Sequence, residues 1–310
     1  MATSELDKSK TVIYGHQTPV GYNEFLVDQI LAADDALKAI TELKKAKLLD
    51  PKNESHRAIL ETDVFKLRRG LCLPCAASTA INQVLGYRLI GDTSGILTIG
   101  DYFRVLFPHH GSYPTPENPK GWLITTPSGD MYHHAIIAFA QGLGITAYSC
   151  QGFTDVSEFQ PILEIGGGVT VSLNNHFVIE QTLAAYPETV EVIDSHPHIK
   201  VLTKTGSNLQ PFQNGKHVVT LLDIRNSEAI VADSFNLPQT NTHGLTATLP
   251  LETLNKYLIY SDHSVSRGIA FLPPNTELPH SLHPIQAYIP SQVTQKITRE
   301  ITKRLTSQQN

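Results

Sequence analysis

Two cysteines separated by two residues, Cys72 and Cys75, lie in the stretch RRGLCLPCAAST at residues 68–79. Such a pair can be a redox couple, half of a metal site, or one nucleophile with a neighbour that takes no part in the reaction. Each of these possibilities requires different partners elsewhere in the chain. The remaining residues therefore decide which chemistry the sequence favours.

A structural zinc site needs four ligands, commonly two Cys-x-x-Cys pairs or one pair together with two spaced histidines. The third cysteine of this chain, Cys150, stands alone, and His133 and His134 are adjacent rather than spaced for chelation. We therefore expect no metal and no other cofactor.

A thiol–disulfide oxidoreductase would use both Cys72 and Cys75. A Cys-x-Pro-Cys motif at the start of a helix resembles thioredoxin, in which the amides of the helix end lower the pKa of the first thiol. That motif normally follows a strand of a βαβ unit, whereas the residues before Cys72 look mainly helical. This alternative stays open but is not favoured.

A nucleophilic cysteine needs a histidine that accepts its proton and a third group that orients the histidine. His217 opens the apolar run HVVTLLDI, and Asp233 ends the run AIVAD. A tight turn at residues 225–227 would pair the two runs as a hairpin, with His217 and Asp233 opposite or diagonally opposite each other. The alternative is that His217 is a structural histidine, one of 14 in the chain, and Asp233 a turn residue.

The elements that must position these residues come in two groups, because helical patterns dominate first and strand patterns follow. This order predicts an α+β fold rather than alternating βαβ units. Periodicity and stop signals predict helices over 23–49, 72–86, 131–142 and from Pro290, a loop over 107–121, and strands over 169–173, 217–224, 229–233 and 268–272.

Four blocks together resemble the papain-like cysteine peptidases, and most closely the bacterial branch that includes double-glycine leader (bacteriocin-processing) peptidases. The resemblance extends over roughly residues 66–272, and the blocks occur in the order of that family. They are CLPCAASTAINQVLGY, GDMYHHAIIAFAQGLGI, GGGVTVSLNN and KHVVTLLDIRNSEAIVADSF.

The resemblance implies a papain-like fold, with the nucleophile helix in an N-terminal helical part and a C-terminal antiparallel sheet that carries the His and Asp. It implies Cys72 as the nucleophile, since Pro74 matches the proline of the family's Cys-Gly-Pro, His217 as the general base and Asp233 as the orienting residue. Alignment with papain itself would instead make Cys75 the nucleophile, so this register stays open.

The function implied is that of a thiol hydrolase, a cysteine peptidase that cleaves an amide bond of a peptide or protein through an acyl-enzyme. An oxidoreductase and an inactive papain-like binding module are the alternatives. The predicted division is a helical extension at 1–62, the peptidase domain at 63–275 and a tail with an amphipathic helix at 276–310. His133 matches a recurrent family histidine, and we interpret it as structural.

The chain departs from the family at three places. The glutamine whose amide binds the oxyanion, normally about six residues before the nucleophile, is replaced by Lys66, or by Arg69 in the Cys75 register. Leu73 replaces the usual glycine after the nucleophile, and about 40 residues are inserted before His217. Because loss of one oxyanion donor costs about 100- to 1,000-fold in rate, another donor must act or the activity is weak.

Composition limits the location and the partners. A formal charge of −5 over 310 residues gives no electrostatic reason to expect binding to nucleic acid or to an anionic membrane. No stretch reaches the roughly 18 apolar residues of a membrane span, no signal peptide is evident, and three cysteines do not make a disulfide framework. We therefore expect a cytoplasmic protein. The C-terminal helix is interpreted either as a surface helix for lipid or a partner, or as a tail docked on its own domain.

Overall fold

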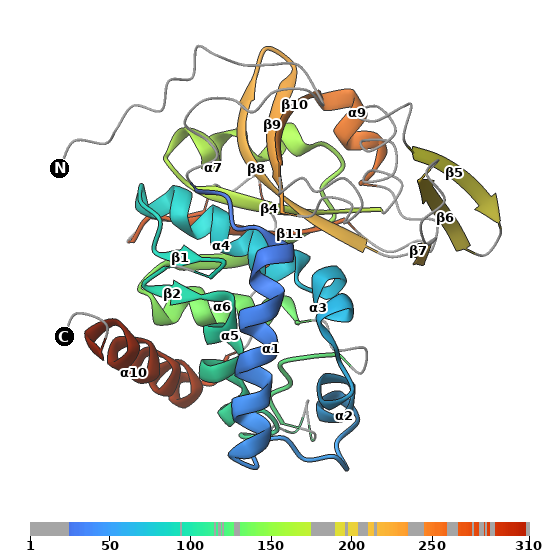
Figure 1. Cartoon of the computed structure of the whole chain (residues 1–310). Coiled ribbons are helices and arrows are strands. Elements are labelled where there is room, and N and C mark those ends of the chain that lie inside the picture. The colour runs from blue at the N-terminus through green and yellow to red at the C-terminus, as the bar shows by residue number, and fades with distance from the viewer. Residues whose placement is uncertain are drawn as a thin grey trace.

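A computed structural model of the chain combines helices with an antiparallel sheet, so the predicted α+β class is confirmed (Figure 1). The structure describes residues 25–93, 95–114, 116, 119, 121–126, 131–174, 190–195, 198–203, 210–213, 216–234, 245–258, 266–274, 276–278, 282, 284–285 and 289–307.

The main sheet has seven strands, and every neighbouring pair of them is antiparallel. The four predicted strands are all present in it, whereas β3, β10 and β12 were not predicted. In spatial order the strands are β10 (Leu245–Pro250), β9 (Glu228–Asp233), β8 (Lys216–Arg225), β4 (Gly168–Asn174), β11 (Arg267–Leu272), β3 (Thr146–Gln151) and β12 (Pro284–Ile285).

Two smaller sheets complete the strands of the described part. The insertion before His217 contains a three-stranded antiparallel sheet, which lies at one side of the molecule in Figure 1. Its strands are β5 (Val190–Ser195), β6 (His198–Thr203) and β7 (Gln210–Gln213), and a separate parallel pair is formed by β1 (Ile90–Gly91) and β2 (Leu97–Thr98).

Helices cover the main sheet on both faces. On one face, α4 packs against β8, β4 and β11, and α6 against β3; on the other face, α7 contacts β8 and β4, and α9 contacts β10 and β9 (Figure 1). The helices are α1 (Gln29–Lys45), α2 (Glu54–Leu60), α3 (Val64–Gly70), α4 (Cys72–Leu85), α5 (Ile99–Leu106), α6 (His133–Gly142), α7 (Gln160–Glu164), α9 (Leu251–Lys256) and α10 (Ser291–Ser307).

Helix α4 lies very close to the sheet because small residues face each other at the crossing. A Cβ on Gly168 of β4 would lie 2.6 Å from the carbonyl oxygen of Ala80, so only glycine fits there. The hydroxyl of Thr220 on β8 donates to the carbonyl of Ala76 at 2.8 Å, and the amide of Gln83 donates to the carbonyl of Leu222 at 2.8 Å. The close approach at Gly168 and the Thr220 bond fix α4 on the sheet, and the Gln83 bond adds a contact near the C-terminal end of the helix.

Helix α1 begins later and ends earlier than the predicted helix over 23–49. It begins at Gln29 because Asp28 accepts hydrogen bonds from the backbone N–H groups of Ile30 and Leu31 and thereby caps the helix. Its inward face is fully buried in the same hydrophobic core as α4. The division of the chain at residue 62 stays a prediction, but α1 shares its core with the predicted peptidase domain.

The C-terminal helix α10 is docked on its own chain. Val293, Ile297 and Ile301, which are spaced four residues apart along this helix, are buried, and α10 packs against α6 and α5. The interpretation as a docked tail helix is therefore confirmed over that of a free surface helix.

Among the described residues, we find no helix with both the length and the apolar character to span a membrane.

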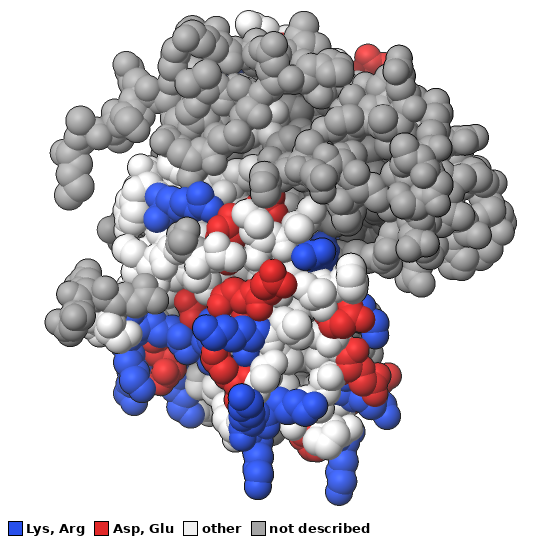
Figure 2. Space-filling view, viewed as in Figure 1, with Lys and Arg blue, Asp and Glu red and all other residues white. Residues whose placement is uncertain are grey.

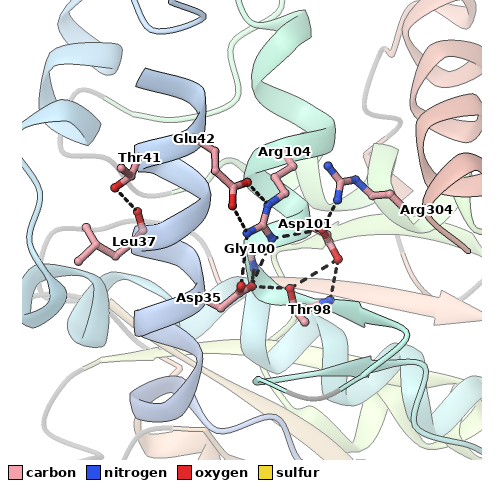
Figure 3. Close-up of polar contacts among 9 residues, drawn as sticks. All are labelled: Asp35, Leu37, Thr41, Glu42, Thr98, Gly100, Asp101, Arg104 and Arg304. Carbon is pink, nitrogen blue, oxygen red and sulfur yellow. Dashed lines mark hydrogen bonds and ion pairs between the residues drawn. The ribbon is translucent and has the colours of Figure 1, made fainter. Parts of the chain in front are cut away.

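An ion-pair cluster joins α1, α5 and α10 (Figure 3). Arg104 of α5 pairs with Glu42 (Nε–Oε2, 2.7 Å) and with Asp35 (Nη2–Oδ1, 3.4 Å), both on α1. Asp101, one turn before Arg104, also pairs with Arg304 of α10 at 2.8 Å. Thus α1 and α10, the first and last helices of the described chain, are both held to α5.

Acidic and basic side chains are interspersed over the helical part on the face shown in Figure 2.

Replacing Arg104 with methionine should lower the free energy of unfolding by about 3 kcal/mol, because the buried Asp101 and the partly buried Asp35 would lose a common cation. Glu42→Gln is the matched control, since the Glu42 side chain is 47% exposed and its loss should cost less than about 1 kcal/mol. Urea unfolding of both variants measures the difference. Equal, small losses would contradict a structural role for the cluster.

Candidate active site

The hairpin predicted from the sequence is present as β8 and β9. Asn226 and Ser227 turn the chain with φ of 48° and 67°, the left-handed values that a two-residue hairpin turn requires. Thr220 is paired with Ala232, and this register places Asp233 opposite the residue before Thr220. His217 therefore lies diagonally across from Asp233, on the same face of the sheet.

His217 and Asp233 form a buried hydrogen bond. The Nε2 of His217 lies 2.7 Å from Oδ1 of Asp233, and the two residues are 5% and 4% exposed. Because Nε2 donates to the carboxylate, Nδ1 is left to face another group. The hydrogen bond fixes the orientation and the tautomer of the ring, as a catalytic base requires.

Cys72 is the first residue of α4, and its thiol lies close enough to the His217 side chain to interact with the imidazole. Cys72 is only partly buried, unlike Cys75 and Cys150. The first backbone bond of α4 runs from the N–H of Cys75 to the carbonyl of Leu71. The N–H of Cys72 precedes this bond and points out of the helix end, where the helix dipole favours negative charge.

The environment of His217 stabilises the imidazolium. Burial alone would lower its pKa, but the charge of Asp233, the hydrogen bond to Asp233 and the contact with Cys72 together raise the pKa to about 10. A histidine with this pKa keeps its proton at neutral pH. The site therefore favours a cation next to the thiol of Cys72, which is the condition for a thiolate.

The two cysteines of Cys-Leu-Pro-Cys have different environments. Cys75 lies one helical turn further into α4 and is fully buried. Burial, together with the nearby Asp28, Cys72 and Asp92, raises the pKa of its thiol well above the usual value. The geometry thus favours Cys72 over the alternative register in which Cys75 attacks.

The residues that replace the expected oxyanion glutamine do not supply an equivalent amide at the site. Lys66 is exposed, and its ammonium donates to the carbonyl of Glu61 at 3.1 Å. The side chain of Arg69 lies outside the described residues. A glutamine that the sequence analysis did not single out, Gln29 of α1, is bonded to Ser234, the neighbour of Asp233. Gln29 lies 43 residues before Cys72 in the sequence, so no local motif connects the two residues.

His133 begins α6, which packs mainly against α10 and β3 rather than against β8 and β9. Its structural role stays a prediction. The adjacent His134 bonds through Nε2 to the carbonyl of Leu123 and stacks on Tyr132, so its ring stabilises the chain before α6. Within the described residues, no group of three or more His, Cys, Asp or Glu side chains is arranged to hold a metal ion.

Comparisons with known proteins give little further information. No family model and no curated protein matches the chain. A solved structure does match: a protein from Bacillus anthracis provisionally described as a C39-like peptidase, with 15% sequence identity and a TM-score of 0.28, over 46% of this chain and 60% of that chain. At this identity and TM-score, the likeness adds nothing to the geometry of the site.

The buried pair predicts a loss of stability in alkali. Because the pKa of His217 is near 6.5 when unfolded and about 10 when folded, the pair stabilises the protein fully below pH 6.5. This contribution is lost as the pH rises from 6.5 to 10. Asp233→Asn keeps a hydrogen-bond acceptor but removes the charge, so its unfolding free energy should depend less on pH in this range. Urea unfolding of wild type and Asp233→Asn at several pH values measures this dependence. If the unfolding free energy of both proteins falls equally between pH 6.5 and 10, the result contradicts the coupling of His217 to Asp233.

Proposed function

We propose that this protein is a papain-like thiol hydrolase that cleaves an amide bond of a peptide or protein, with Cys72 as nucleophile, His217 as general base and acid, and Asp233 as the orienting residue. The observation that carries the proposal is the continuous contact from Cys72 to His217 to Asp233, with 2.7 Å between the last two. The positions come from three separate elements, α4, β8 and β9, which the fold brings together.

The proposed reaction begins with Cys72 as a thiolate next to the protonated ring of His217. The thiolate attacks the carbonyl carbon of the substrate and forms a C–S bond, and the carbonyl oxygen becomes an oxyanion. The N–H of Cys72, at the start of α4, is placed to donate to that oxyanion. The tetrahedral intermediate collapses, the C–N bond breaks, and His217 gives its proton to the leaving amine.

Hydrolysis of the acyl-enzyme then regenerates the thiolate of Cys72. His217 takes a proton from an attacking water, the oxygen of that water bonds to the acyl carbon, and the C–S bond breaks. The proton stays on His217, and the sulfur leaves as a thiolate, which restores the starting ion pair. Throughout both halves of the reaction, Asp233 keeps its charge and holds the imidazole through Nε2.

The burial of Cys75 disfavours the oxidoreductase alternative. A disulfide exchange cycle needs a second thiol that can ionise and attack the mixed disulfide, but Cys75 is fully buried and burial raises its pKa well above the usual range. The inactive binding module differs from the proposal only in chemistry, and the same experiment distinguishes the two.

The test is cleavage of a peptide library, followed by mass spectrometry, together with labelling by a peptide that carries a thiol-reactive electrophile. Wild type should cleave peptides and acquire one label at Cys72, whereas Cys72→Ser and His217→Ala should lose at least about 1,000-fold of the rate. Cys75→Ser is the matched control, because it removes the neighbouring thiol from the same helix and should retain most of the activity.

Cleavage that survives Cys72→Ser would contradict the proposal. If Cys75→Ser removes the label and the activity while Cys72→Ser retains both, the mechanism is kept but the nucleophile is misassigned. A wild-type protein that neither cleaves nor takes the label is a binding module.

A further inference from the structure

Gln29, the first residue of α1, connects the two halves of the candidate site. Its side chain is almost completely buried, with 1% of the residue exposed. Its Nε2 donates to the carbonyl of Arg68 at 2.6 Å, and its Oε1 accepts from the hydroxyl of Ser234 at 3.2 Å. Its backbone N–H also donates to the carbonyl of Ser234 at 2.9 Å. The amide orientation is fixed, because a carbonyl can only accept.

The two residues that Gln29 joins are neighbours of the proposed catalytic groups. Ser234 directly follows Asp233 at the end of β9, and Arg68 is in α3, four residues before Cys72. These two segments are far apart in the sequence, so only contacts in the folded protein hold them together. Gln29 thus bridges the strand end that carries the carboxylate and the helix that leads into the nucleophile.

The other polar links between α4 and the sheet lie further along the helix. Thr220 bonds to Ala76 and Gln83 bonds to Leu222, so both links join α4 to β8. Neither of them fixes β9, which carries Asp233. The side-chain bonds of Gln29 tie the end of β9 to the segment before Cys72.

Resting on the proposed function, we infer that Gln29 is a positioning residue: it holds Asp233, and through it the imidazole of His217, in register with Cys72. The N-terminal helix α1 is then a working part of the active site, not a detachable extension. Without the Gln29 side chain, Ser234 keeps only the backbone bond to α1, and the end of β9 is freed to shift. Misplacement by about 1 Å near a reacting centre costs on the order of 100-fold in rate.

The experiment measures the rate of iodoacetamide alkylation of Cys72 between pH 5 and 9 by mass spectrometry, in the full chain, with urea unfolding of each variant. Gln29→Met removes both side-chain bonds at nearly constant volume. Ser234→Ala removes only the hydroxyl bond. Gln83→Met is the matched control, since it also breaks one amide–carbonyl bond between α4 and the sheet but lies far along the helix from Cys72.

Gln29→Met should slow alkylation of Cys72 at pH 6 by about 10- to 100-fold and move the profile toward that of an ordinary thiol near pH 8.5. Ser234→Ala should move it in the same direction by less. Gln83→Met should leave the profile unchanged even where it lowers stability. This contrast separates positioning from general destabilisation.

An unchanged profile in Gln29→Met, or an equal change in Gln83→Met, overturns the inference. Should Gln29→Met fail to fold, Ser234→Ala decides: a wild-type profile in that variant also overturns it. If Cys72 of the wild type reacts like an ordinary thiol and His217→Ala changes nothing, it is the proposed function that fails instead.

Discussion

The close burial of α4 against the sheet is the constraint on which the rest of the structure depends. At Gly168, where β4 crosses the helix, the backbones are too close for a side chain. The hydroxyl of Thr220 donates a hydrogen bond to the carbonyl of Ala76. With α4 fixed on β8, its first residue meets the first part of that strand. The position of Cys72 next to His217 is therefore a consequence of how the core packs.

The same burial gives the site its electrostatics. His217 and Asp233 are both removed from water, so their charges interact strongly and the histidine keeps its proton. Cys75 is buried without a cation, and its thiol stays neutral. Two cysteines one helical turn apart thus acquire different chemistry from their depth and their neighbours: one lies at the helix end beside a charged pair, and the other in the apolar core.

The contacts between α1 and α5 hold in place the helix that supports the candidate site. Asp35 accepts from the backbone of Gly100 and contacts Arg104, which places α1 firmly on α5. A side chain at Gly100 would collide with the carboxylate of Asp35. Since α1 carries Gln29 at its first position, the ion-pair cluster further along the helix also helps to fix the residue that contacts Ser234.

Local patterns in the sequence predicted the parts of this fold that depend on local chemistry. Apolar runs on either side of a polar turn predicted β8, β9 and hence the approach of His217 to Asp233, and the small residues before Gly86 predicted α4. The sequence did not predict β3, β10 or the role of Gln29. Those depend on pairing and contacts between distant segments, which leave no periodic signal in the chain. The choice between Cys72 and Cys75 likewise required burial, which a four-residue motif does not encode.

The measurement that tests the central claim most directly is a titration of the His217 side-chain nitrogens by ¹⁵N NMR from pH 5 to 10, assigned with His217→Ala. Both nitrogens should remain protonated at pH 8, since the pKa is about 10, and Asp233→Asn should lower the midpoint. A ring that loses its proton near pH 6.5 in the wild type would contradict an imidazolium next to Cys72, and with it the proposed nucleophile.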